Sequence, residues 1–221
     1  MLRAENLTMR YFRRTGQANH FLAVKHASLT LNPGEVLVLM GRSGSGKTTL
    51  LHMLAGLLTP TEGKVWLDAQ DLYALSDGPL SRLRGERLGV VPQGRSAVDS
   101  LTVWENILLP GALRGERPRE AEARRWMAAL GVESLAQARP AELSGGELRR
   151  VAIARTLTQA PEVILADEPT GDLDDENTAR VLDILRDAAK TEGRAVLIVS
   201  HDDAARACAD RVCRMDGGII Y

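Results

Sequence analysis

Residues 41–48 read Gly-Arg-Ser-Gly-Ser-Gly-Lys-Thr, and this stretch decides the fold of the chain. It follows an unbroken apolar run, Val36–Met40, and precedes a helical pattern that reaches Leu54. The stretch fits G-x-x-x-x-G-K-S/T at every fixed position, and the strand–loop–helix context argues against a chance glycine-rich turn. Glycines let successive backbone N–H groups curl around an anion, and the helix N-terminus adds partial positive charge. The sequence therefore predicts a loop that binds nucleotide phosphates, without choosing among GTPases, kinases and ATPases.

Two side chains at the end of this loop and two after a later strand complete the predicted chemistry. Lys47 places a cation on the β- and γ-phosphates, and the Thr48 hydroxyl is a ligand for Mg²⁺. The apolar run Val163–Ala166 ends in Asp167 and Glu168. Asp167 is expected to hold Mg²⁺ through water, because this ion keeps much of its hydration shell, and Glu168 to act as general base. Such a strand end alone would favour a simple cap, but beside a complete phosphate loop the functional interpretation is favoured.

A second potential anion site lies about a hundred residues further on. Ser144 is a good helix N-cap, and Gly145 and Gly146 expose backbone N–H groups at the start of an apolar helix. ATP has one triphosphate, and the phosphate loop already binds it. A second site therefore makes sense if it serves a nucleotide held by another copy of the chain, although in isolation the pentapeptide Leu143–Glu147 would be read as an ordinary cap.

The pentapeptide Leu143–Glu147 resembles the signature sequence of ABC ATPases, and the remaining motifs agree with that family in order and number. Gln93 resembles the Q-loop glutamine, Gly171–Asp174 the D-loop and His201 the switch histidine. Tyr11 is the best match to the aromatic residue that stacks on adenine, with the neighbouring Phe12 as the alternative. The resemblance covers essentially the whole chain.

The resemblance implies a role for each residue that matches a family motif, with ATP and Mg²⁺ as cofactors. The expected catalytic residues are Glu168, His201, Gln93 and Lys47. The expected nucleotide-binding residues are Tyr11, Gly41, Ser43, Gly44, Ser45, Gly46, Lys47, Thr48 and Thr49. The residues expected to act on the nucleotide of a second copy are Leu143, Ser144, Gly145, Gly146, Glu147 and Asp174. The expected metal ligands are Thr48, Gln93 and, through water, Asp167.

The predicted architecture is a single α/β domain with a helical insertion. Residues 1–95 and 160–221 form the α/β core and residues 96–159 a helical subdomain that carries the signature. Strands are expected over 2–12, 22–31, 36–40, 64–67, 163–166, 195–199 and 211–215, helices over 175–190 and 202–209, and a loop over 13–19. The resemblance implies a P-loop NTPase core with a mixed sheet, parallel and RecA-like in part, and an N-terminal antiparallel β-subdomain.

The composition and charge of the chain limit the kinds of partner that it is expected to have. A formal net charge of −1 and a pI near 6.4 give no electrostatic reason to expect nucleic acid. No apolar run approaches the roughly 18 to 20 residues that cross a bilayer, and the first residues lack the apolar core of a signal peptide. The chain is expected in the cytoplasm. Any membrane association is expected to come through another polypeptide, which places it on the cytoplasmic side of the inner membrane.

Within the family the chain resembles the exporter and extractor branch typified by MacB and LolD. The residues that support this are Leu101–Ile107 and Asp167–Asp174, whereas Pro92 stands where a phenylalanine is usual. The resemblance implies a second copy and a FtsX/MacB-type permease as partners. The alternative is a relative coupled to a FtsX-like protein that regulates cell-wall hydrolysis. A DNA-repair ATPase would need a long coiled-coil insertion, and a translation factor would carry two motif sets.

Overall fold

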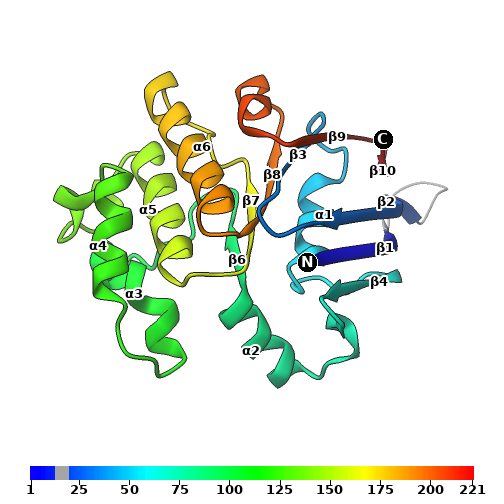
Figure 1. Ribbon diagram of the computed structural model, residues 1–221, viewed down its shortest axis with the longest axis horizontal. Coiled ribbons are helices and arrows are strands. Elements are labelled where there is room, and N and C mark those ends of the chain that lie inside the picture. Colours follow the sequence, from blue (N-terminus) through cyan, green and yellow to red (C-terminus); the bar gives the residue numbers. More distant parts are fainter. Residues whose placement is uncertain (13–19) are drawn as a thin grey trace.

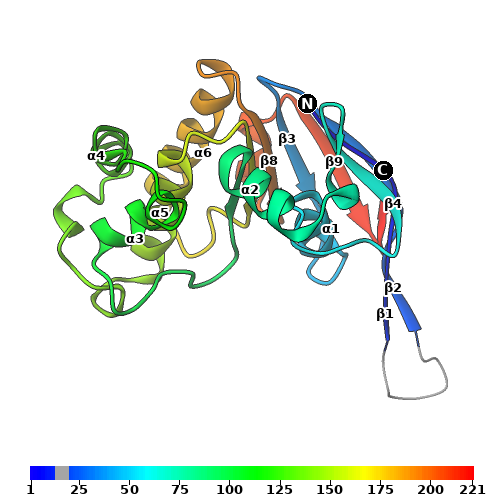
Figure 2. The ribbon, with the colours of Figure 1, turned by 90° about the horizontal axis from the view of Figure 1, so that it is seen from below.

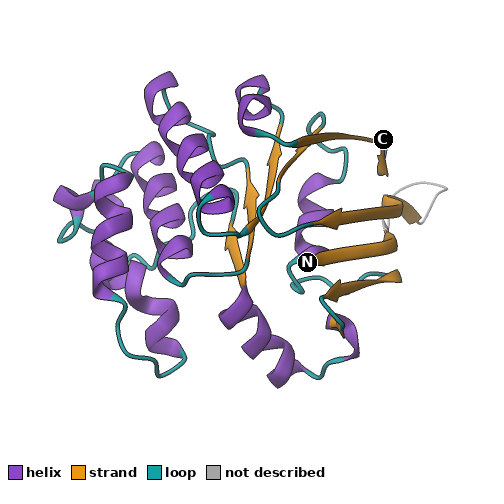
Figure 3. Cartoon of the chain, viewed as in Figure 1, coloured by secondary structure: helices purple, strands orange, loops and turns teal. Residues whose placement is uncertain are grey.

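The computed structural model describes residues 1–12 and 20–221, which form two β-sheets and a group of helices to one side (Figures 1 and 3). The loop expected over residues 13–19 lies outside the described residues. Apart from that segment, the chain has no helix that is both long and apolar enough to cross a bilayer.

The larger sheet is built from buried, mostly parallel strands. Its order is β10-β9-β3-β8-β7-β6, and only β10 runs antiparallel to its neighbour. Every residue of its three central strands is buried, as the continuous apolar runs predict. The strands are β3 (Val36–Met40), β6 (Leu88–Val91), β7 (Val163–Asp167), β8 (Ala195–Ser200), β9 (Arg211–Asp216) and β10 (Ile219–Ile220).

The smaller sheet is antiparallel, with the order β2-β1-β4-β5. The hairpin of β1 and β2 extends beyond the rest of this sheet, as the view from below shows (Figure 2). Its two strands are the longest of the structure, and their far end brings aromatic residues toward the phosphate loop. The four strands are β1 (Leu2–Phe12), β2 (His20–Leu31), β4 (Glu62–Leu67) and β5 (Gln70–Asp71).

Alternate residues of the large sheet pack into two separate cores. Leu37 and Leu39 of β3 face α1 (Lys47–Leu54) and the small sheet. Val36 and Val38 face the other core, which is formed with α5 (Gly145–Thr158) and α6 (Asp175–Lys190). The remaining helices are α2 (Asp77–Arg87), α3 (Val103–Leu113) and α4 (Glu120–Ala129); α3 and α4 pack beside α5, far from the small sheet (Figure 1).

As the sequence predicts, the described residues form an α/β core with a mixed sheet, an antiparallel β-subdomain and a group of helices. One local expectation differs from the structure. The helix expected over 202–209 is a 3₁₀ helix, Asp203–Cys208, which Asp202 caps by accepting the Ala204 N–H. Residues 96–159 are mostly helical, as expected, although the first helix of that range, α3, starts only at Val103.

Candidate functional site

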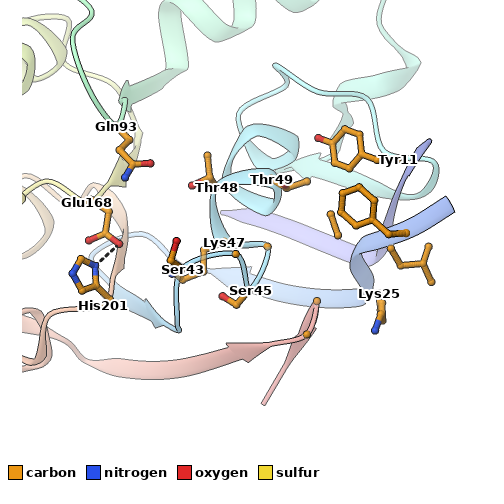
Figure 4. A pocket seen from close by; sticks show the side chains of 17 residues that line it. Tyr11, Lys25, Ser43, Ser45, Lys47, Thr48, Thr49, Gln93, Glu168 and His201 are labelled. Atoms are coloured by element: carbon orange, nitrogen blue, oxygen red, sulfur yellow. Dashed lines mark hydrogen bonds and ion pairs between the residues drawn. The ribbon is translucent and has the colours of Figure 1, made fainter. Parts of the chain in front are cut away.

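The carboxyl ends of four adjacent strands bring the predicted catalytic residues to one cavity. The loop after β3, Gln93 after β6, Glu168 after β7 and His201 after β8 all line a cavity of about 590 Å³ (Figure 4). The order β3-β8-β7-β6 makes this convergence unavoidable, because parallel strands end at the same edge of the sheet. Of the predicted nucleotide-binding residues, the cavity is lined by Tyr11, Ser43, Gly44, Ser45, Gly46, Lys47, Thr48 and Thr49, whereas Gly41 lies beneath the loop.

The phosphate loop needs glycine for backbone geometry and for space. Gly46 has φ +106° and serves as the N-cap of α1, and a Cβ there would overlap the backbone carbonyl of Ala23. The loop curls around the Lys47 ammonium, which donates to the carbonyl oxygens of Gly41 at 2.6 Å and Arg42 at 3.1 Å. The cation is therefore held at the centre of the loop, at the N-terminus of α1, where an anion is bound most strongly.

Asp167 is the last residue of β7, and its buried carboxylate has no hydrogen-bond partner among the residues that the structure describes. Burial raises the pKa of this carboxyl above its ordinary value, and the Glu168 carboxylate adds to the rise. The Thr48 hydroxyl lies close enough to oppose the shift, although not in hydrogen-bonding geometry. A buried carboxylate facing a hydroxyl supplies the hard oxygen ligands that Mg²⁺ prefers, so these residues fit that ion.

Glu168 adopts a backbone conformation that is unusual for its residue type. Its φ is +50°, in the left-handed region, and its N–H donates to the Val199 carbonyl at 2.8 Å. The turn directs the side chain into the cavity, where one oxygen lies 2.9 Å from Nδ1 of His201 and the other accepts the Ser200 hydroxyl at 3.4 Å (Figure 4). The residue expected to act as general base and the predicted histidine thus lie side by side, at the end of the cavity that the phosphate loop lines.

The aromatic residues at the far end of the cavity bear on an alternative that the sequence left open. Tyr11 lines the cavity and stacks on Phe21, with ring centroids 5.5 Å apart and planes inclined by 26°. Phe12 does not line the cavity; it is 59% exposed and meets His20 edge-on. Tyr11 rather than Phe12 therefore lies in this cavity, with Phe21 as a second ring.

The signature residues form a second cavity, of about 350 Å³, which shares no lining residue with the first among the described parts of the chain. Ser144 caps α5 by accepting the Glu147 N–H at 3.3 Å, and its own N–H donates to the Glu147 carboxylate at 2.7 Å. Asp174 lines this cavity too, where it caps α6 by accepting the Asn177 N–H at 2.8 Å. Leu143 is buried beneath the signature, in the core between the helices and the large sheet.

Comparison with known proteins identifies the family. A sequence profile of the ABC transporter family matches residues 24–171. The chain belongs to the ABC transporter family. Its fold is shared with a dimeric structure of MJ0796, a bacterial ABC transporter cassette: the identity is 32%, the TM-score is 0.93, and the match covers 100% of this chain and 96% of that one. A dimeric post-hydrolysis state of MJ0796 bound to ADP and Pi matches at 33% identity and a TM-score of 0.92, with the same coverage.

Membership of the family makes the chain an ABC-type ATPase, and the geometry shows which residues the sequence did not single out. Phe21 extends the aromatic end of the cavity, and Lys25 lines the same cavity from β2. Arg149, in the first turns of α5, donates to the Pro92 carbonyl beside Gln93. The alternation of β2 could have indicated Phe21, but no short-range pattern indicates Arg149, because its contact joins segments 57 residues apart in the sequence.

Removing the ring of Tyr11 or of Phe12 tests which of the two stacks on the adenine of ATP. Tyr11→Ala is expected to raise KM for ATP roughly tenfold with little change in kcat, because stacking on a base is worth ~1–3 kcal/mol. Phe12→Ala, the matched control on the same strand, is expected to leave KM within the error of the assay. Steady-state ATPase kinetics measure both, and a larger KM effect for Phe12 than for Tyr11 would contradict the assignment.

Proposed function

We propose that this ABC ATPase works as a head-to-tail dimer in which each MgATP lies between the phosphate loop of one copy and the signature of the other. The observation that carries the proposal is the presence of two helix N-termini, at α1 and α5, in two cavities without a common residue. One triphosphate cannot occupy both cavities of one chain. The dimeric structures described for MJ0796 support the formation of a dimer here as well.

In this proposal the phosphate loop and the end of β7 bind the nucleotide and its ion. Tyr11 stacks on adenine, the backbone N–H groups of residues 41–49 hold the phosphates, and Lys47 neutralises their charge. Thr48 and Gln93, and Asp167 through water, would hold Mg²⁺. When bound, this ion would supply Lewis-acid stabilisation of the negative charge that develops on the phosphate oxygens.

The hydrolytic step is assigned to the residues at the phosphate end of the cavity. Glu168 accepts a proton from the attacking water, and His201 orients the same water and contacts the γ-phosphate. The hydrogen bond between Glu168 and His201 fixes the position of one side chain relative to the other, so that both can contact the same water. Gln93 follows β6 and lies on the side of Glu168 that faces away from His201 (Figure 4).

The signature residues act on the nucleotide of the second copy. Ser144 and the N–H groups of Gly145 and Gly146 provide the second half of the phosphate site, which Asp174 also lines. Glu147 holds Ser144 by hydrogen bonds and Leu143 is buried beneath it. Because Ser144 and the two glycines lie at the start of α5, beside α3 and α4, closing the dimer moves the helical region 96–159 against the partner's nucleotide.

Hydrolysis is proposed to drive a separate integral membrane permease of the FtsX/MacB type in an exporter or extractor. The support is the sequence resemblance at Leu101–Ile107 and Asp167–Asp174. Attachment through that permease would place the ATPase at the cytoplasmic face of the inner membrane. Membranes solubilised from cells that express a tagged chain should then yield this permease together with it.

The dependence of turnover on protein concentration tests the dimer. Because each complete site needs two copies, ATPase activity per chain is expected to rise with protein concentration until the dimer is saturated, and to require Mg²⁺. The measurement is phosphate release over a wide range of chain concentration. Activity per chain that stays constant down to concentrations at which light scattering finds only monomer would overturn the proposal.

A further inference from the structure

The signature helix α5 binds the segment that carries Gln93 at three points. The Thr156 hydroxyl lies 3.1 Å from the Val90 carbonyl oxygen and 2.9 Å from the Ala152 carbonyl oxygen of its own helix, and its one proton is shared between these acceptors. Arg149 donates to the Pro92 carbonyl at 2.8 Å. Arg155 donates to the carbonyl and the hydroxyl of Ser96 at 2.7 and 2.6 Å. The contacts at Pro92 and Ser96 flank Gln93, one directly before it and the other three residues after it.

The segment around Gln93 has few other anchors. Strand β6 ends at Val91, and none of the backbone-to-backbone hydrogen bonds outside the helices and strands of the described chain involves residues 93–97. Beyond it, residues 98–102 are held by Asn106 of α3, whose side chain accepts the Val98 N–H and donates to three carbonyls. The path of the chain through Gln93 is therefore set largely by side chains of α5.

Arg149 is placed unusually for a charged residue. Only 8% of it is exposed, and among residues 1–12 and 20–221 no carboxylate lies within ion-pair distance of its guanidinium. Burying a cation costs free energy unless its N–H groups have acceptors. The hydrogen bond to the Pro92 carbonyl is therefore costly to break, and it holds Pro92 close to α5. The guanidinium also lies beside Gly171, at 3.7 Å from where a side chain there would begin. Gly171 closes the turn after Glu168 by donating to the Glu168 carbonyl at 3.1 Å.

We infer that Arg149 is a positioning residue for Gln93: its guanidinium ties the signature helix to the peptide before Gln93 and packs beside the turn after Glu168. The inference rests on the role of Gln93 in the proposed function. The position of Gln93 in the cavity then follows α5. When α5 meets the nucleotide of the second copy, the chain's own Gln93 moves with it, so each signature helix links the two nucleotide sites.

The test compares Arg149→Met with a matched control, Arg84→Met. Arg84 makes the same kind of bond, from a guanidinium to the carbonyl of Gly56 at 2.9 Å, but it lies on α2 and lines no part of the nucleotide cavity. Arg149→Met is expected to lower kcat about tenfold or more with KM for ATP within about twofold, because a small misplacement of a catalytic group is costly. Arg149→Lys, which keeps a donor for Pro92, is expected to restore most of kcat. Arg84→Met is expected to lower the melting temperature alone.

Combination with Gln93→Ala shows whether Arg149 acts through the glutamine. The double variant is expected to be no slower than Gln93→Ala alone, because an absent side chain cannot be mispositioned. Multiplied losses, or a wild-type kcat for Arg149→Met, would overturn the inference while leaving the proposed function in place. A wild-type kcat for Gln93→Ala would overturn both. Should Arg149→Met fail to fold, Arg149→Gln replaces it under the same expectations, since the shorter amide cannot reach Pro92 from the same backbone position.

Discussion

Glu168→Gln is expected to lower kcat for ATP by about two to four orders of magnitude, the range that a positioned general base contributes. The amide has nearly the same shape as the carboxylate and still reaches the His201 ring, but it cannot accept a proton from water. The carboxylate faces the cavity from a turn at φ +50°, so no neighbouring acid can take its place without a change in the backbone. The measurement is single-turnover hydrolysis at saturating MgATP.

ATP binding by Glu168→Gln is expected to stay intact, and the bound nucleotide to hold the two copies together. Size-exclusion chromatography with MgATP should therefore show a stable dimer that wild type, which hydrolyses its nucleotide, does not retain. Glu176→Gln is the matched control: Glu176 is an exposed carboxylate on α6 that pairs with Arg180, and this variant should turn over normally. Near-normal hydrolysis by Glu168→Gln would remove the general-base assignment.

Ser144→Arg is expected to abolish hydrolysis while the isolated monomer keeps its affinity for ATP. Ser144 caps α5 at the mouth of the signature cavity, 350 Å³ in volume, and an arginine there would fill the place of the partner's phosphates. The chain's own phosphate loop lies in the other cavity and is untouched. A fluorescent ATP analogue titrated against dilute protein measures the affinity, and phosphate release at high protein concentration measures turnover.

Ser144→Arg both removes the cap of α5 and adds a large side chain, so a control must separate the two effects. Ser144→Ala removes the hydroxyl that accepts the Glu147 N–H, at a cost of about 1 kcal/mol in stability, but adds nothing to the cavity. It should therefore retain much more activity than Ser144→Arg. A collapse of ATP affinity in monomeric Ser144→Arg would mean that the signature serves the nucleotide of its own chain.

The large sheet and the phosphate loop could be predicted because their signals are local. Runs such as Val163–Ala166 are apolar throughout since both faces of the strand are buried, and the loop motif has fixed spacing. Helix α2 carries no such signal: Leu80 is its only buried side chain, so no apolar stripe marks it. The segment after β8 is predicted as an ordinary helix, whereas it forms a 3₁₀ helix that Asp202 caps.

Local sequence patterns could not predict contacts between segments that are distant in the chain. The stacking of Tyr11 on Phe21 depends on the register of β1 and β2, which shifts at three places along the hairpin. The choice between Tyr11 and Phe12 depends on the same register. The bond from Arg149 to Pro92 requires α5 to cross the end of β6, a packing that neither segment specifies alone.

Complementation between two inactive variants tests the shared site most directly. Ser144→Arg keeps its phosphate loop, Lys47→Ala keeps its signature, and each should be inactive alone. In an equal mixture, random pairing gives mixed dimers with one complete site, so the account predicts recovery of about a quarter of the wild-type turnover per chain. A mixture that pairs, by light scattering with MgATP, but stays as inactive as its components would contradict the claim that each ATP is held between two copies.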